Sequence, residues 1–125
     1  MPGEVVLVRP EAPAKRVNAS ELLRSRPVAS TPLFGLHRCP LGLPGESVLL
    51  MSVPKRVLRR AVDRNTVRRL ARESLQERRR QAAGSALFLR IKRQPAGFAA
   101  LTQRARKAVW RAELARVFSL GVGHA

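Results

Sequence analysis

The chain has 125 residues, enough for one compact domain and too few for two. Hydrophobic residues make up 45% of it and occur in short runs, which indicates a folded domain and excludes a disordered basic tail. Its 25 Lys and Arg against 8 Asp and Glu leave a net charge of +17, a density that repels itself unless a polyanion neutralises it. Most of the basic residues are Arg, whose planar guanidinium suits phosphate groups and stacking. Nucleic acid is therefore the expected partner.

The sequence argues against a membrane protein and against a metal-binding one. Its longest apolar runs, such as residues 48–53, are far shorter than the roughly 18 residues of a spanning helix, so no membrane contact is expected. The first residues lack the basic, apolar and small-residue order of a secretory signal, and we expect a cytoplasmic protein. A lone Cys39, with only His37 and His124 as further metal-binding candidates of that kind, predicts no disulfide, no metal site and no cofactor bound by the protein alone.

The N-terminal part is predicted to hold an arm and a short helix. Residues 1–15 contain three prolines and no periodic pattern, which predicts a flexible arm with only a weak strand at residues 5–8. A helix is predicted from residue 18 or 20 to residue 26, with Leu22 and Leu23 on its inner side and a proline to end it.

Three strands are predicted in the rest of the chain. Residues 33–39 alternate partly between apolar and polar, and residues 47–53 form an apolar run after a turn rich in glycine and proline. These two segments are expected to pair. In the third segment, residues 85–93, Leu87, Leu89 and Ile91 would lie on one face of the strand.

Two long helices complete the predicted domain, which spans residues 16–118 and leaves a C-terminal tail at 119–125. The first runs from Asp63, as N-cap, to residue 81 or 82, before Gly84. The second covers residues 98–118 and carries two apolar stripes. One stripe holds Phe98, Leu101, Ala105, Ala108, Val109 and Ala112, and the other holds Trp110, Leu114, Val117 and Phe118.

The segment from residue 55 to residue 73 carries a dense group of basic side chains. At about 100° per residue, an apolar arc of the helix would pack on the sheet and a second arc would face solvent. Arginines at i, i+4 and i+8 could then reach successive phosphates of a folded RNA. The predicted RNA-binding residues are Lys55, Arg56, Arg59, Arg60, Arg64, Asn65, Arg68, Arg69 and Arg72.

A charged helical face is more often simply solvated, and Glu73 and Glu77 could pair with Arg69 and Arg80 along the helix. Such pairs would neutralise two arginines at most. The uncompensated charge that is left favours nucleic-acid binding.

The spacing Arg64-Asn65-x-x-Arg68-Arg69-x-x-Arg72-Glu73, preceded by Lys55-Arg56 and Ala61-Val62, resembles the signature of the ribonuclease P protein subunit. The order of strand, basic turn, helix, strand and C-terminal helix is also similar to that family over residues 16–118. The residue after Asn65, usually basic in the family, is Thr66, which removes one charge and keeps the spacing.

The resemblance implies an α+β two-layer sandwich of the ribosomal protein S5 domain 2-like type, in which the signature helix joins two parallel strands by a left-handed βαβ crossover. It implies that the signature residues contact the catalytic RNA, and that a cleft between sheet and first helix takes the single-stranded leader of precursor tRNA. The family places aromatic residues in that cleft, whereas this chain offers Leu22, Leu23, Phe34 and His37 as candidates. A core phenylalanine and an incidental histidine are equally good interpretations of the last two.

The eight carboxylates are scattered and predict no acid and base pair, and no nucleophile has a histidine and acid beside it. No catalytic residue is therefore expected in the protein. In the family the RNA hydrolyses the bond with bound Mg²⁺ while the protein assists substrate binding, which implies an RNA-based endoribonuclease that removes the tRNA 5′ leader.

Two alternatives stay open at this point. A ribosomal or other structural RNA-binding protein would share the size and charge but would not restore cleavage by a catalytic RNA. A DNA-binding helix is disfavoured, because the glycine-containing turn of a helix-turn-helix is missing before Asp63. No DNA partner is expected.

Overall fold

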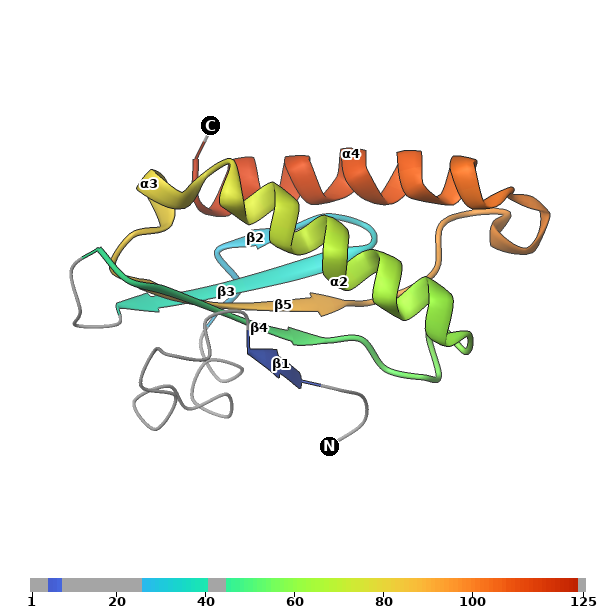
Figure 1. Cartoon of the computed structure of the whole chain (residues 1–125), viewed down its shortest axis with the longest axis horizontal. Helices are drawn as coiled ribbons and strands as arrows, with labels where there is room; N and C mark the ends of the chain where they lie inside the picture. The colour runs from blue at the N-terminus through green and yellow to red at the C-terminus, as the bar shows by residue number, and fades with distance from the viewer. Residues whose placement is uncertain (1–4, 8–25, 41–44, 124–125) are drawn as a thin grey trace.

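The structure is a computed structural model that describes residues 5–7, 26–40 and 45–123, and its described elements form two layers (Figure 1). One layer is a five-stranded sheet in the order β1-β4-β5-β3-β2. The other layer holds the helices, with α2 and α4 lying across the same face of the sheet.

The strands are β1 (Val5–Leu7), β2 (Ala29–Ser30), β3 (Phe34–Pro40), β4 (Ser47–Ser52) and β5 (Ser85–Ile91). The helices are α2 (Ala61–Gln76), α3 (Arg79–Ala82), the 3₁₀ turn η2 (Phe98–Ala100) and α4 (Gln103–Gly121). The predicted α+β class is confirmed.

The sheet is mixed. β4 and β5 pair in parallel, with α2 between them in the chain, whereas the other neighbours pair antiparallel. The three predicted strands are confirmed to within two residues at their ends. The expected pairing of the first two is wrong, because β5 lies between β3 and β4 and pairs with both. The weak strand expected in the N-terminal arm is β1, which pairs with β4, so this part of the arm belongs to the sheet. The helix predicted for residues 18–26, with Leu22 and Leu23, lies almost wholly outside the described residues.

The core lies between the sheet and the helices. Alternate residues of the three central strands point into it, as expected for strands with period two. They meet the inner faces of α2 and α4, and burial of such side chains stabilises the fold by about 25 cal/mol per Å² of apolar area. The main contributors are Phe34, Leu36, Leu49, Met51, Leu87, Leu89, Val67, Leu70, Trp110, Leu114 and Phe118. Of the two stripes predicted on the last helix, the one with Trp110 is confirmed, whereas Ala108 and Ala112 of the other are exposed.

Both long helices differ from the prediction at their ends. α2 begins at Ala61, its N-cap Arg60 makes no side-chain capping bond, and Asp63 is a buried residue inside the first turn. The predicted Asp63 N-cap is therefore wrong. α4 begins at Gln103, where the Oγ1 of Thr102 accepts a hydrogen bond from the amide of Ala105 at 3.1 Å. It continues to Gly121, so residues 119–121 belong to the helix and not to the expected tail.

The helix predicted to reach residue 81 or 82 is interrupted after Gln76 because Arg78 turns inward. Its guanidinium donates to the carbonyl and the hydroxyl of Ser74, both at 3.0 Å. It also donates to the Ala115 carbonyl at 3.3 Å, the Ser119 hydroxyl at 3.1 Å and the Gly123 carbonyl at 3.1 Å. The side chain of Arg78 thus connects the end of α2 to the last turns of α4. The short helix α3 begins at the next residue, Arg79.

The last residue of α4, Gly121, lies against the sheet with no room for a side chain. A Cβ there would be 2.7 Å from Cδ2 of the fully buried Leu36, 3.1 Å from Cγ2 of Val28 and 3.2 Å from Cβ of Ala29. Glycine at this position lets the end of the helix approach β2 and β3.

We expect Gly121→Ala to lower the free energy of unfolding by about 1–3 kcal/mol, because overpacking outweighs the better helix propensity of alanine. Chemical unfolding measures the change. Gly35→Ala is the matched control, since a Cβ at Gly35 meets no atom of the described residues within 4 Å, and it should change stability by less than about 0.5 kcal/mol. Equal stability of the two variants would contradict this packing.

Candidate nucleic-acid interface

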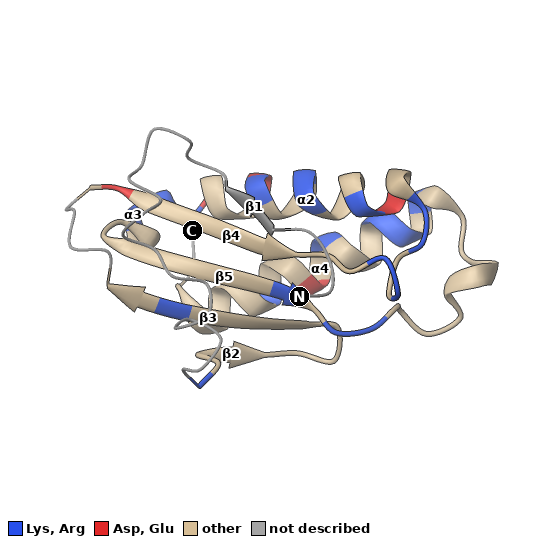
Figure 2. Ribbon diagram, turned by 90° about the horizontal axis from the view of Figure 1, so that it is seen from below, with Lys and Arg blue, Asp and Glu red and all other residues tan. Residues whose placement is uncertain are grey.

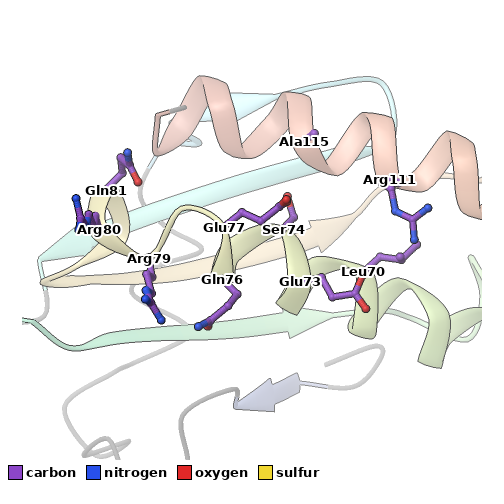
Figure 3. A pocket seen from close by; sticks show the side chains of 10 residues that line it. All are labelled: Leu70, Glu73, Ser74, Gln76, Glu77, Arg79, Arg80, Gln81, Arg111 and Ala115. Atoms are coloured by element: carbon purple, nitrogen blue, oxygen red, sulfur yellow. The ribbon is translucent and has the colours of Figure 1, made fainter. Parts of the chain in front are cut away.

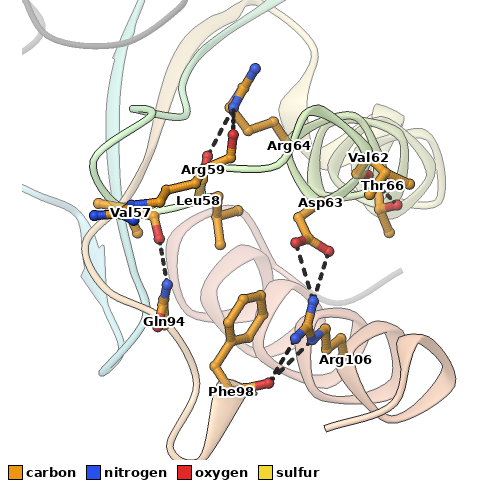
Figure 4. A network of polar contacts seen from close by, with 10 residues as sticks. All are labelled: Val57, Leu58, Arg59, Val62, Asp63, Arg64, Thr66, Gln94, Phe98 and Arg106. Carbon is orange, nitrogen blue, oxygen red and sulfur yellow. Dashed lines mark hydrogen bonds and ion pairs between the residues drawn. The ribbon is translucent and has the colours of Figure 1, made fainter. Parts of the chain in front are cut away.

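The turn that precedes α2 is held with its carbonyl groups inward (Figure 4). The carbonyl of Pro54 accepts hydrogen bonds from the amides of Val57 and Leu58 at 3.0 and 3.1 Å. The side chain of Gln94 donates to the Val57 carbonyl at 2.9 Å. Because the backbone of the turn is satisfied internally, its basic side chains are free to face solvent. Four of the predicted RNA-binding residues are exposed here: Lys55, Arg56, Arg59 and Arg60.

Arg64, predicted to face the RNA, is buried and supports this turn instead. Its side chain is 8% exposed, and Nη1 donates to the carbonyls of Leu58 at 3.0 Å and Arg59 at 2.8 Å. The guanidinium suits the position because its fixed fork of donors can serve two carbonyl groups at once. The prediction that Arg64 lies on the solvated arc is wrong, and the residue positions the basic turn.

Arg68 is also wrongly placed on the solvated arc, since it is 7% exposed. Its Nη1 donates to Oδ1 of the exposed Asn65 at 2.6 Å. The row Arg64, Arg68 and Arg72 is thus not a row of exposed guanidinium groups. The exposed row on α2 is Asn65, Arg69 and Arg72, which we call the α2 stripe. Figure 2 shows Lys and Arg concentrated on α2 and in the turn before it, with few on the strands.

Thr66 stands where the family usually has a basic residue, and it does not face solvent. It is 8% exposed, and its hydroxyl donates to the carbonyl of Val62 at 2.7 Å. Thr66 is therefore not part of the exposed α2 stripe.

The start of α2 is fastened to α4 by a buried ion pair (Figure 4). Nη1 of Arg106 lies 3.2 Å from Oδ2 and 3.4 Å from Oδ1 of Asp63, with the two residues 8% and 1% exposed. The same guanidinium donates to the carbonyl of Phe98 at 2.9 and 3.3 Å and lies 3.7 Å from the centre of its ring. This contact fixes the orientation of the helix that carries the stripe.

Positive charge is crowded at the end of β5 as well. The ammonium of Lys92 donates to the hydroxyl of Ser30 at 2.7 Å. Burial lowers the pKa of Lys92, and repulsion from Arg93 and Arg90 lowers it further, against a smaller opposite effect of Glu113. Anions that approach this end of the sheet would relieve that repulsion.

The predicted leader-cleft residues separate in the structure. Phe34 is fully buried in the core, on the same side of the sheet as α2 and α4, which agrees with the core interpretation that the sequence left open. His37 is on the face turned away from the helices, 3% exposed, with its ring 6.3 Å from that of Phe88 in an edge-on arrangement. Its contact with a leader stays a prediction. Leu22 and Leu23 lie outside the described residues.

Three functional positions were missed by sequence reasoning, namely Gln94, Arg106 and the inward-facing Arg78. Each forms a hydrogen bond with a residue at least 37 positions away in the sequence. A local sequence pattern does not reveal such a contact. Among residues 5–7, 26–40 and 45–123, no three His, Cys, Asp or Glu side chains come together as a metal site. Within the same ranges no helix has the length and apolar character needed to cross a membrane.

Comparison with known proteins gives one family. The family model Ribonuclease P matches residues 6–116, a range that includes the basic turn, α2 and most of α4. No curated protein and no solved structure matches the chain. Membership implies an RNA partner within a ribonucleoprotein that processes tRNA. Because the match covers most of the sequence and its basic signature, the chain belongs to the ribonuclease P family, as a protein component of that enzyme.

Proposed function

We propose that this protein binds the catalytic RNA of ribonuclease P and the 5′ leader of precursor tRNA, and so assists endonucleolytic removal of the leader in the cytoplasm. The observation that carries the proposal is the basic turn next to the α2 stripe. Their exposed cations lie on adjoining segments, and the turn's backbone is held by Arg64 and Gln94. Such a surface suits the phosphates of a folded RNA, whose neutralisation releases counterions.

In this proposal the protein supplies electrostatics and the RNA supplies hydrolysis. The exposed groups of the turn and stripe are hydrogen-bond donors, which hold phosphate oxygens and not cations. Mg²⁺ is therefore proposed to bind with the RNA. Neutralising phosphates of both RNAs lowers the repulsion between catalytic RNA and substrate, and it reduces the need for salt. The family resemblance further leads us to propose that α2 joins β4 to β5 by a left-handed crossover.

The test is cleavage of precursor tRNA by a bacterial ribonuclease P RNA at low magnesium, with and without stoichiometric protein. We expect strong stimulation by the wild-type protein and little by Arg69→Glu/Arg72→Glu. Tight RNA binding without stimulation would overturn the proposal in favour of a structural RNA-binding protein. Equal stimulation of cleavage for precursor tRNAs with a one-nucleotide leader and with a long leader would argue against contact with the leader.

A further inference from the structure

The helical layer carries a groove away from the sheet, between α2, α3 and α4 (Figure 3). Its volume is about 720 Å³, and Leu70 of α2 and Ala115 of α4 contribute apolar surface to it. This is ample space for one planar base, and apolar or guanidinium surface is what an unstacked base packs on in proteins.

Exposed arginines lie toward the two ends of this groove. Arg111 reaches from α4 toward Leu70, whereas Arg79 and Arg80 extend from α3 at the other end (Figure 3). No described residue forms a hydrogen bond or ion pair with any of these three guanidinium groups. Guanidinium groups at opposite ends of one groove suit a strand with several phosphates better than a single small anion.

Two carboxylates line the groove between these arginines. Glu73 and Glu77 are one turn apart on α2, and both are exposed. Among the described residues, the only ion pair that either carboxylate forms is a long one, 3.9 Å from Nη1 of Arg78 to Oε1 of Glu77, whose side chain is 70% exposed. Such exposed pairs are weak. A carboxylate accepts hydrogen bonds only, so the middle of the groove favours a donor and repels a phosphate.

We propose that this groove binds an unpaired nucleotide of RNA, with its flanking phosphates at Arg111 and at Arg79 and Arg80. The exocyclic amino group of the base donates to Glu73 or Glu77, as a carboxylate accepts from the amino group of cytosine. Adenine, cytosine and guanine carry such a group and uracil does not, so the groove discriminates against uracil. This proposal rests on the proposed function only in taking RNA as the ligand. It adds a second RNA contact, separate from the α2 stripe.

The test uses the full chain with its alanine methyl groups isotopically labelled, and short single-stranded oligoadenylate, oligocytidylate and oligouridylate as probes. We expect the Ala115 methyl resonance to shift with the first two and oligouridylate to bind several-fold more weakly. Arg111→Gln should weaken oligocytidylate binding several-fold, whereas Arg116→Gln, which removes another exposed charge on α4 outside the groove, should have a smaller effect. Glu73→Gln should reduce the preference over uridylate.

An unmoved Ala115 resonance, equal losses in the two arginine variants, or equal binding of oligouridylate would overturn the groove proposal. These outcomes are distinct from failure of the proposed function. If wild-type protein stimulates cleavage by ribonuclease P RNA while the groove ignores the oligonucleotides, only the groove is disproved. If the groove responds as expected without stimulation of cleavage, the groove stands and the role in leader removal falls.

Discussion

Arg106→Met should lower the free energy of unfolding by about 3–5 kcal/mol, because it leaves the carboxylate of Asp63 buried without its partner. Asp63 is 1% exposed, so water cannot replace the lost guanidinium without opening the layer. The Phe98 carbonyl also loses its donor, and the Phe98 ring loses the cation stacked against it. Urea-induced unfolding of the two proteins measures the difference.

The double variant Asp63→Asn/Arg106→Met distinguishes the cost of an unpaired buried carboxylate from the loss of the other contacts of Arg106. It should be more stable than Arg106→Met alone, because it removes the uncompensated charge together with the partner. Arg104→Met serves as the control, since Arg104 is exposed on the same helix and should change stability by less than about 0.5 kcal/mol. A loss at Arg106 no larger than that at Arg104 would show that the buried pair does not hold α2 in place.

Arg69→Glu/Arg72→Glu should weaken binding to ribonuclease P RNA by tenfold or more, and flatten the slope of log K against log salt by about two. The reason is that both side chains are exposed on the α2 stripe and belong to no hydrogen bond or ion pair among the described residues. Thermal stability should be nearly unchanged. Filter binding over a range of salt concentrations, with a melting curve for each variant, measures both effects.

Two comparisons sharpen this prediction. Arg104→Glu/Arg116→Glu makes the same change in net charge on α4 and should weaken RNA binding less. Arg64→Met removes a buried donor, so it should lower the melting temperature through the lost bonds to Leu58 and Arg59. If Arg104→Glu/Arg116→Glu lost as much RNA affinity as the stripe variant, net charge and not the stripe would determine binding.

Arginine has two separate uses in this protein. Arg38, Arg64, Arg78 and Arg106 each donate hydrogen bonds to backbone carbonyls in another segment of the fold. Arg38, for example, joins β3 to β5 through the Ser85 hydroxyl at 2.8 Å and to the ends of α3 and α4. Charge alone therefore overstates the RNA-binding surface, since part of it holds the helices to the sheet.

The sequence by itself determined the class of fold, the main strands, the two long helices and the basic signature. These features depend on local periodicity, turn residues and composition, which can be recognised in the sequence without knowledge of distant contacts. The sequence also identified Lys55, Arg56, Arg69 and Arg72 as exposed. For Arg69 and Arg72, the reason is that the apolar residues of α2 fall on the opposite arc of the helix.

Only the tertiary structure decided which arginines face inward. Arg64 and Arg68 lie at the edge of the buried arc of α2, and a long side chain there can turn toward solvent or toward nearby carbonyl groups. The choice depends on the path of the turn before the helix, which Gln94 holds from the segment after β5. In the same way, the local sequence predicts Asp63 as an N-cap, whereas in the structure its carboxylate pairs with Arg106. The guanidinium of Arg106 comes from α4, 43 residues away in the sequence. Contacts between segments so distant in sequence leave no local pattern, and they set the geometry of the site.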